Sequence, residues 1–265
     1  MDRGRLALFL RSRREATQPE DVGLPRTGRR RTPGLRREEV AALSGVATHY
    51  YTRIEQPRGP VPSPSVLAAI GKALRLSDEE STYLNLLAGY APGGSGTDED
   101  STLEHVDEGL LRVFDQVRDA PAMIVTDLGE TIAQTPLAAR ILGDETGYTG
   151  LARARVHRWF TRPSERALTP AADHAAHSRA LVAQLASVSA GAGSGSRADR
   201  IVADLLRSSD EFRTLWREHP VSGPRCAPKR IRHAESGEIT LRGETLLDPD
   251  GRHALLLLHI TADDG

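Results

Sequence analysis

Four side chains that can hydrogen-bond to a nucleic acid stand close together in one short segment. Thr48, His49, Tyr50 and Arg53 supply hydroxyl, imidazole and guanidinium groups. Such groups exchange hydrogen bonds with base edges and phosphate oxygens. If this segment is a helix that enters the major groove, Thr48 and His49 lie at its leading end, where bases are read. We therefore predict that these four side chains contact DNA.

Positive charge gathers just ahead of that segment. Arg29, Arg30 and Arg31 form the densest basic run, and Arg36 and Arg37 follow shortly after it. The first 90 residues carry 15 Lys and Arg against 10 Asp and Glu, whereas the rest of the chain carries 20 against 26. A basic first part and an acidic second part indicate that the first part meets a polyanion. We expect Arg36 and Arg37 to contact backbone phosphates, whereas a solvated basic loop is one interpretation of Arg29 to Arg31.

Two short helices joined at a glycine must position these side chains. The apolar spacing over residues 35–44 predicts a helix, and Gly45 ends it by taking a positive φ. Thr48 is expected to cap a second helix over residues 49–56, which Pro57 ends. This arrangement is the helix-turn-helix pattern. Tyr51 and Ile54 are expected to face the core.

Further helix signals extend the first domain to residue 90. A helix is predicted over residues 6–15, another begins at Ser63-Pro64, and a capping box opens a third at residues 77–80. Residues 1–90 are therefore expected to form an all-α, five-helix DNA-binding domain. Residues 91–101, rich in Gly, Ser and Asp, are expected to be a linker.

The remaining residues, 102–265, predict one α+β domain. Two short strands, 122–126 and 130–134, flank an expected turn at residues 127–129, and three further strands close the chain. Between them the spacing of apolar residues predicts helices over 136–142, 156–160, 171–188 and 201–216, and an earlier helix over 103–117. Strands, then helices, then strands favour an antiparallel sheet covered by helices.

A pocket in this domain would use its few large apolar side chains. The candidates are Met123, Ile132, Trp159, Phe160, Leu206, Phe212, Leu215 and Trp216. Ordinary core packing is the alternative for each of them. The sequence therefore allows, but does not require, a small hydrophobic ligand.

Enzyme and metal chemistry are poorly supported. His174 and His177 share a helix face with Asp173 nearby, but no third ligand stands at a suitable spacing, so we expect a solvated Ala-rich helix. The single cysteine, Cys226, has no evident base partner. Neither a phosphate-binding Gly-rich loop nor a nucleophile elbow occurs. We expect no catalytic residues, no metal, no cofactor, no membrane span and a cytoplasmic location.

The first 90 residues resemble a known family of regulators. This part of the chain resembles the MmyB-like branch of the actinobacterial Xre helix-turn-helix regulators. The residues that carry the resemblance are 22–25, 28–40, 50–56, 59–60 and 62–64. Residues 121–122, 136–139, 143–144, 208–212, 215–216 and 229–233 resemble that family's second domain. The resemblance implies a five-helix, repressor-like DNA-binding domain followed by a PAS-like domain. It also implies that Arg29, Arg30 and Arg31 approach the DNA backbone or minor groove.

What the resemblance implies for function is a transcriptional regulator, expected to be a repressor, that binds a double-stranded DNA operator as a homodimer. Its second domain would sense a small hydrophobic ligand that is fatty-acid-like in some members of the family. The alternative is a second domain that serves only dimerisation or protein interaction, with no small-molecule ligand.

Overall fold

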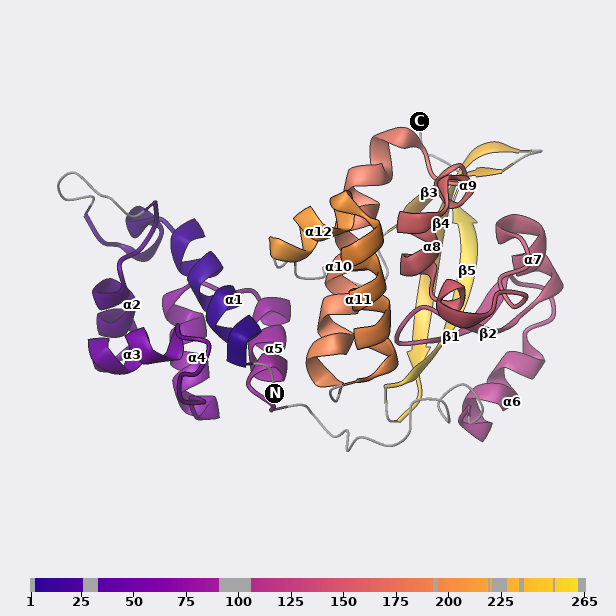
Figure 1. Ribbon diagram of the computed structural model, residues 1–265. Helices are drawn as coiled ribbons and strands as arrows, with labels where there is room; N and C mark the ends of the chain where they lie inside the picture. The colour runs from indigo at the N-terminus through magenta and orange to yellow at the C-terminus, as the bar shows by residue number, and fades with distance from the viewer. Residues whose placement is uncertain are drawn as a thin grey trace. The chain divides into compact units, whose positions relative to one another are not determined.

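The computed structural model of the chain describes residues 3–25, 33–90, 106–192, 195–218, 220, 228–233, 236–249 and 251–261 (Figure 1). The chain divides into two compact units, Met1–Pro92 and Gly93–Gly265. Arg29 to Arg31, the predicted linker at 91–101 and Cys226 lie outside the described residues. The predicted domain bounds thus stay predictions.

The first unit is helical throughout its regular structure. Its five α-helices agree in number and order with the prediction. Their bounds are α1 Arg3–Ala16, α2 Arg37–Ser44, α3 Thr48–Ile54, α4 Pro64–Ala73 and α5 Asp78–Leu87, and a 3-10 helix, η1, covers Pro19–Val22.

Local sequence signals end and begin these helices as expected. Gly45 follows α2 with a φ of 67°, a backbone conformation that glycine adopts without a steric penalty. Ser77 and Glu80 form the predicted capping box, in which each side chain accepts a hydrogen bond from the other residue's backbone N–H. The predicted cap of α3 is wrong, because Ala47 precedes the helix in an extended conformation and Thr48 is already its first residue.

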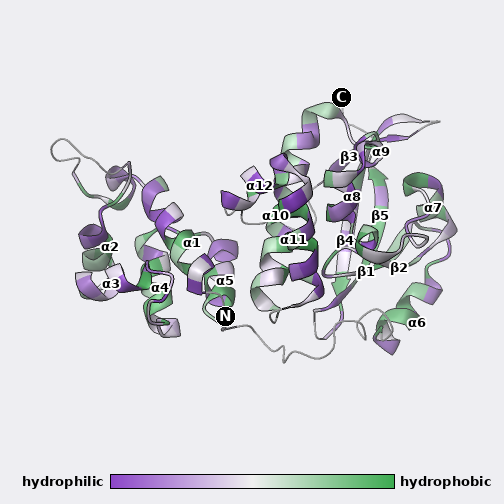
Figure 2. Ribbon diagram, in the orientation of Figure 1, coloured by the Kyte–Doolittle hydropathy of each residue, from purple (hydrophilic) through white to green (hydrophobic). Residues whose placement is uncertain are grey.

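The core of the first unit joins helices that are distant in sequence. The ring of Phe9 in α1 packs edge-on against Tyr83 in α5, with 5.1 Å between centroids. Tyr51 and Ile54 of α3 are buried, as predicted. Figure 2 shows the hydrophobic stretches of α1 and α4 within this unit. Burial of one side of α3 leaves its other side exposed.

The second unit combines a sheet with two groups of helices. Its strands are β1 Ala122–Thr126, β2 Thr131–Gln134, β3 Lys229–His233, β4 Gly237–Leu247 and β5 His253–Thr261. Its helices are α6 Glu108–Gln116, α7 Pro136–Leu142, α8 Arg155–Thr161, α9 Pro163–Arg166, α10 His174–Gly191, α11 Arg197–Ser208 and α12 Asp210–Arg217, with 3-10 turns η3 Gly150–Arg153 and η4 Ala171–Asp173. The predicted single helix over 201–216 is wrong, because the chain is extended at Ser209, whose hydroxyl caps α12.

The sheet is antiparallel, with strand order β2-β1-β5-β4-β3, which confirms the predicted α+β class. Successive strand residues face opposite sides. On one side, Ile124 and Leu255 pack against Leu110 of α6. On the other, Met123 packs with Ala138 and Leu142 of α7, and α10 lies over the rest of this face (Figure 1). The space under α10 is the site described below.

Candidate nucleic-acid interface and ligand cavity

The four predicted DNA-contacting side chains of α3 share its outer side. Thr48, His49 and Arg53 are exposed or half-buried, and so is Tyr50. Their neighbours in the helix turn inward to the core, so the outer side carries hydroxyl, imidazole and guanidinium groups. This arrangement can exchange hydrogen bonds with base edges and phosphates.

A buried carboxylate fixes the position of α3. Glu55 accepts hydrogen bonds from Nε and Nη2 of Arg14, at 2.6 and 3.2 Å, and from Nε of Arg37 at 2.7 Å. Nη1 of Arg14 donates to the carbonyl of Leu35. Although burial opposes ionisation of Glu55, the hydrogen bonds from the two guanidinium groups keep its pKa below the usual value. The sequence alone allows a structural, capping or paired role for Glu55, and the structure shows that it is paired.

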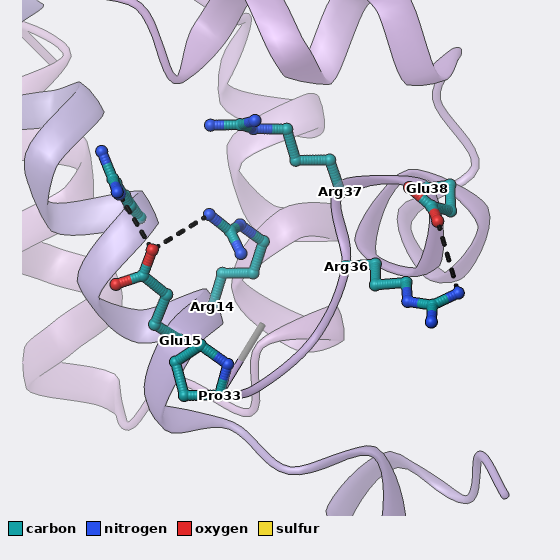
Figure 3. A pocket seen from close by; sticks show the side chains of 7 residues that line it. Arg14, Glu15, Pro33, Arg36, Arg37 and Glu38 are labelled. Atoms are coloured by element: carbon teal, nitrogen blue, oxygen red, sulfur yellow. Dashed lines mark hydrogen bonds and ion pairs between the residues drawn. The ribbon is translucent and has the colours of Figure 1, made fainter. Parts of the chain in front are cut away.

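The start of α2 presents two arginines to a polar groove, shown in Figure 3. Arg37 is partly held by Glu55, with 43% of its side chain exposed. Arg36 points away from it toward Glu38, at 3.9 Å, and is 42% exposed. The groove is also lined by Arg11, Arg14, Glu15 and Pro33. Both predicted arginines are therefore accessible, and Arg37 has a structural role as well.

The second unit contains two adjoining cavities between α10 and the sheet, which share lining residues and which we call the two lobes. The first lobe measures about 260 Å³ and reaches Leu181 and Leu247. The second measures about 340 Å³ and reaches Leu142 and Leu258. We call the residues that line both lobes the waist: Met123, Arg155, His177, Ala180, Lys229, Thr245 and Leu256.

Small residues make this cavity possible. Ala176 and Ala180 are one helical turn apart on the face of α10 that looks at the sheet, and Gly243 lies opposite on β4. A Cβ at Gly243 would approach the side chain of Leu258 to 3.2 Å, so a larger residue there would require this leucine to move. Larger side chains at these three positions would fill the space between α10 and the sheet.

Among the described residues, Met123 is the only predicted pocket residue on the cavity wall. Ile132 packs on the opposite side of the sheet, with Leu110 and Ile124. Trp159 is buried and donates its indole N–H to the hydroxyl of Ser178. The rest belong to the core formed by α8, α10, α11 and α12: Phe160, Leu206, Phe212, Leu215 and Trp216. The structure does not bring these residues together with Met123.

The histidines of α10 are half-buried and packed on an aromatic ring, which corrects the expectation of a solvated helix. The rings of His174 and His177 pack edge-on against Trp159, with centroid distances of 5.3 and 4.5 Å. His177 also lines the waist. Burial, reinforced by the charges of Arg155 and Lys229, lowers the pKa of His177 to about 3. His177 is therefore neutral in the folded unit near neutral pH.

The depressed pKa of His177 makes the second unit sensitive to acid. The unfolded chain takes up a proton near the ordinary value of 6.5, whereas the folded unit does so only near 3. The free energy of unfolding should therefore fall as the pH drops from about 6.5 toward 3, by up to about 1.4 kcal/mol per pH unit from this group. Urea unfolding followed by tryptophan fluorescence at several pH values should show a shallower dependence for His177→Gln. The exposed His259→Gln should behave as the unaltered chain, and equal slopes for all three proteins would contradict the assignment.

Comparisons with known proteins agree with the two units. Residues 106–265 match the family model described as the MmyB-like transcription regulator ligand binding domain, and residues 5–84 match a helix-turn-helix domain. Both describe domains of transcription regulators and not of enzymes. A search of curated proteins found no match. None of the helices in the described part of the chain is long and apolar enough to span a membrane.

Proposed function

The chain belongs to the MmyB-like transcription regulators, and we infer that a small hydrophobic, fatty-acid-like molecule controls its affinity for DNA. Because it carries both a helix-turn-helix domain and the family's ligand-binding domain, it is a DNA-binding regulator with a ligand-binding domain. The observation that carries this inference is the cavity under α10. Its walls are mainly apolar, and each lobe is close in size to known small-molecule sites, which measure roughly 300–1,000 Å³.

We also propose how the first unit meets DNA. The outer side of α3 reads bases through Thr48, His49, Tyr50 and Arg53, while Arg36 and Arg37 contact phosphates. Arg29 to Arg31 add sequence-independent affinity. In this proposal the protein is a homodimeric repressor on a two-fold-related operator, as its repressor-like DNA-binding domain suggests.

Ligand control follows from linkage between the two sites. A ligand can shift the DNA affinity only by the ratio of its own affinities for the DNA-competent and DNA-incompetent arrangements. Absence of any apolar molecule after purification, together with no thermal shift on adding long-chain acids, would contradict the ligand half of this proposal.

The alternative, a second unit that serves dimerisation or protein interaction, has one observation in its favour. Leu111 and Val113 of α6 are 37% and 43% exposed, on a helix that covers the sheet face opposite the cavity. Exposed apolar side chains of this kind can contribute to a contact between two copies. The two hypotheses differ in what they require of the cavity. Ligand sensing requires that a ligand occupy it, whereas dimerisation or protein interaction does not.

Replacing Arg29, Arg30 and Arg31 together with alanine tests the DNA half. We expect weaker binding to DNA from upstream of the protein's own gene. The salt dependence should also flatten, by about 0.9 in the slope of log K against log salt for each phosphate that the variant no longer neutralises. The measurement is fluorescence anisotropy with labelled duplex across a salt series.

A control with the same loss of charge uses arginines of the second unit. Arg112, Arg179 and Arg207 are each more than half exposed, at 79%, 56% and 76%, and their joint replacement should leave the slope almost unchanged. If the first triple variant keeps the original slope, the three arginines do not contact phosphates.

A further inference from the structure

Positive charge is concentrated at the middle of the cavity. The waist includes the cations Arg155 and Lys229, while no acidic residue lines both lobes within the described part of the chain. The acids of the cavity wall instead lie in one lobe only, as Glu145 does in the first and Asp173 in the second. An anion would therefore be most favoured where the two lobes meet.

Two buried polar atoms at the waist have no hydrogen-bond partner among the described residues. They are Nε2 of His177 and Nε of Arg155. Buried polar atoms without a hydrogen-bond partner are costly and rare in folded proteins, and a bound water or ligand can supply the missing partner. Since His177 is neutral, its ring can exchange one hydrogen bond with a bound group without adding charge.

The acids nearest Arg155 are already shared with another cation. Glu165 lies 3.5 Å from Nε of Arg155 but accepts a hydrogen bond at 2.9 Å from Arg158, which is fully buried. Glu145 also pairs with Arg158. The two carboxylates balance the two guanidinium groups in formal charge, but Arg158 makes the short contacts, and Nε of Arg155 is left with a 3.5 Å contact and no hydrogen bond among the described residues.

Apolar walls extend from the waist in both directions. The first lobe is lined by Val125, Leu181 and Val188, and the second by Leu142, Ile231 and Leu258. An anionic group at the waist would consequently have apolar surroundings on both sides. A single chain with the charge at one end would fill one lobe and leave the other empty.

We propose that the cavity takes a carboxylic acid with two alkyl arms, whose carboxylate sits at the waist beside Arg155, His177 and Lys229 while one arm occupies each lobe. This inference rests on the proposed function, since it requires the cavity to hold an apolar ligand. It goes further by assigning the ligand a branched shape and a charge, and by assigning three residues to the recognition of that charge.

The test compares three probes with the full-length protein by isothermal titration calorimetry. They are 2-hexyldecanoic acid, its straight-chain isomer hexadecanoic acid, and methyl 2-hexyldecanoate. We expect the branched acid to bind at least about tenfold more tightly than either of the others. Lys229→Met should weaken binding of the branched acid but leave the affinity for the ester unchanged. Arg207→Met, a control that removes an exposed cation lining neither lobe, should affect neither.

Each alternative outcome points to a different failure. Equal affinity for the acid and its ester would overturn the recognition of charge, and equal affinity for the two isomeric acids would overturn the two-armed shape. If none of the three probes binds, the proposed ligand sensing itself fails. A Lys229→Met variant that binds both acid and ester as the unaltered chain does would remove Lys229 from the site.

Discussion

Replacing Glu55 with alanine should unfold the first unit under conditions in which the second unit stays folded. Glu55 and Arg14 have side chains that are 0% and 4% exposed, and the substitution would leave the guanidinium of Arg14 buried without its partner. Breaking a buried ion pair in this way costs about 3–5 kcal/mol. The whole stability of a small domain is only about 5–15 kcal/mol. Loss of DNA binding should accompany the unfolding, because Glu55 ties α3 to α1 and α2.

The distribution of aromatic residues allows the two units to be followed separately. Both tryptophans, Trp159 and Trp216, belong to the second unit, whereas four of the five tyrosines belong to the first. In urea, the tyrosine absorbance transition should move to lower concentration in Glu55→Ala, and the tryptophan transition should not move. Glu38→Ala is a matched control, since Glu38 is 62% exposed and lies 3.9 Å from Arg36. An unchanged tyrosine transition in Glu55→Ala would show that the pair contributes little.

The helices of the first unit could be predicted because their boundaries are marked locally. Gly45, the Ser63-Pro64 pair and the capping box at Ser77 each act within a few residues. The pairing of Glu55 with Arg14 could not be predicted in the same way. These residues are 41 positions apart, and only the tertiary fold brings them together. From the sequence, a structural role, a capping role and pairing with a nearby arginine all stay open for Glu55, and nothing in it selects Arg14 as the partner.

The cavity escaped prediction for a different reason. Large apolar residues are the usual sequence signal for a pocket, but most of them fill the core among α8, α10, α11 and α12. The cavity instead depends on Ala176, Ala180 and Gly243, which are small. Alanines four positions apart on a helix do not distinguish a close helix contact from an opening. The strand pairing that places Gly243 opposite α10 involves β5, which follows it in the chain.

Replacing Ala180 with phenylalanine should abolish the response to ligand while leaving DNA affinity intact. Ala180 belongs to the waist and is exposed to the cavity, so a benzyl group can extend into the open space without displacing core residues. It would occupy the junction that a ligand must cross. We expect ligand affinity to fall on the order of 100-fold. The affinity of the variant for labelled upstream DNA should then be the same with and without 2-hexyldecanoic acid, whereas the unaltered protein should give two different affinities.

A neighbouring alanine separates this effect from a general change in α10. Ala175 is also exposed but does not line either lobe, so Ala175→Phe adds the same group outside the cavity and should keep the ligand response. If Ala180→Phe still binds ligand normally, the cavity under α10 is not the ligand site. If it fails to bind the ligand but its DNA affinity equals that of the unaltered protein with ligand bound, then the added ring mimics the ligand. That result would identify occupancy of the waist, and not a particular contact of the ligand, as the event that selects between the two DNA-binding states.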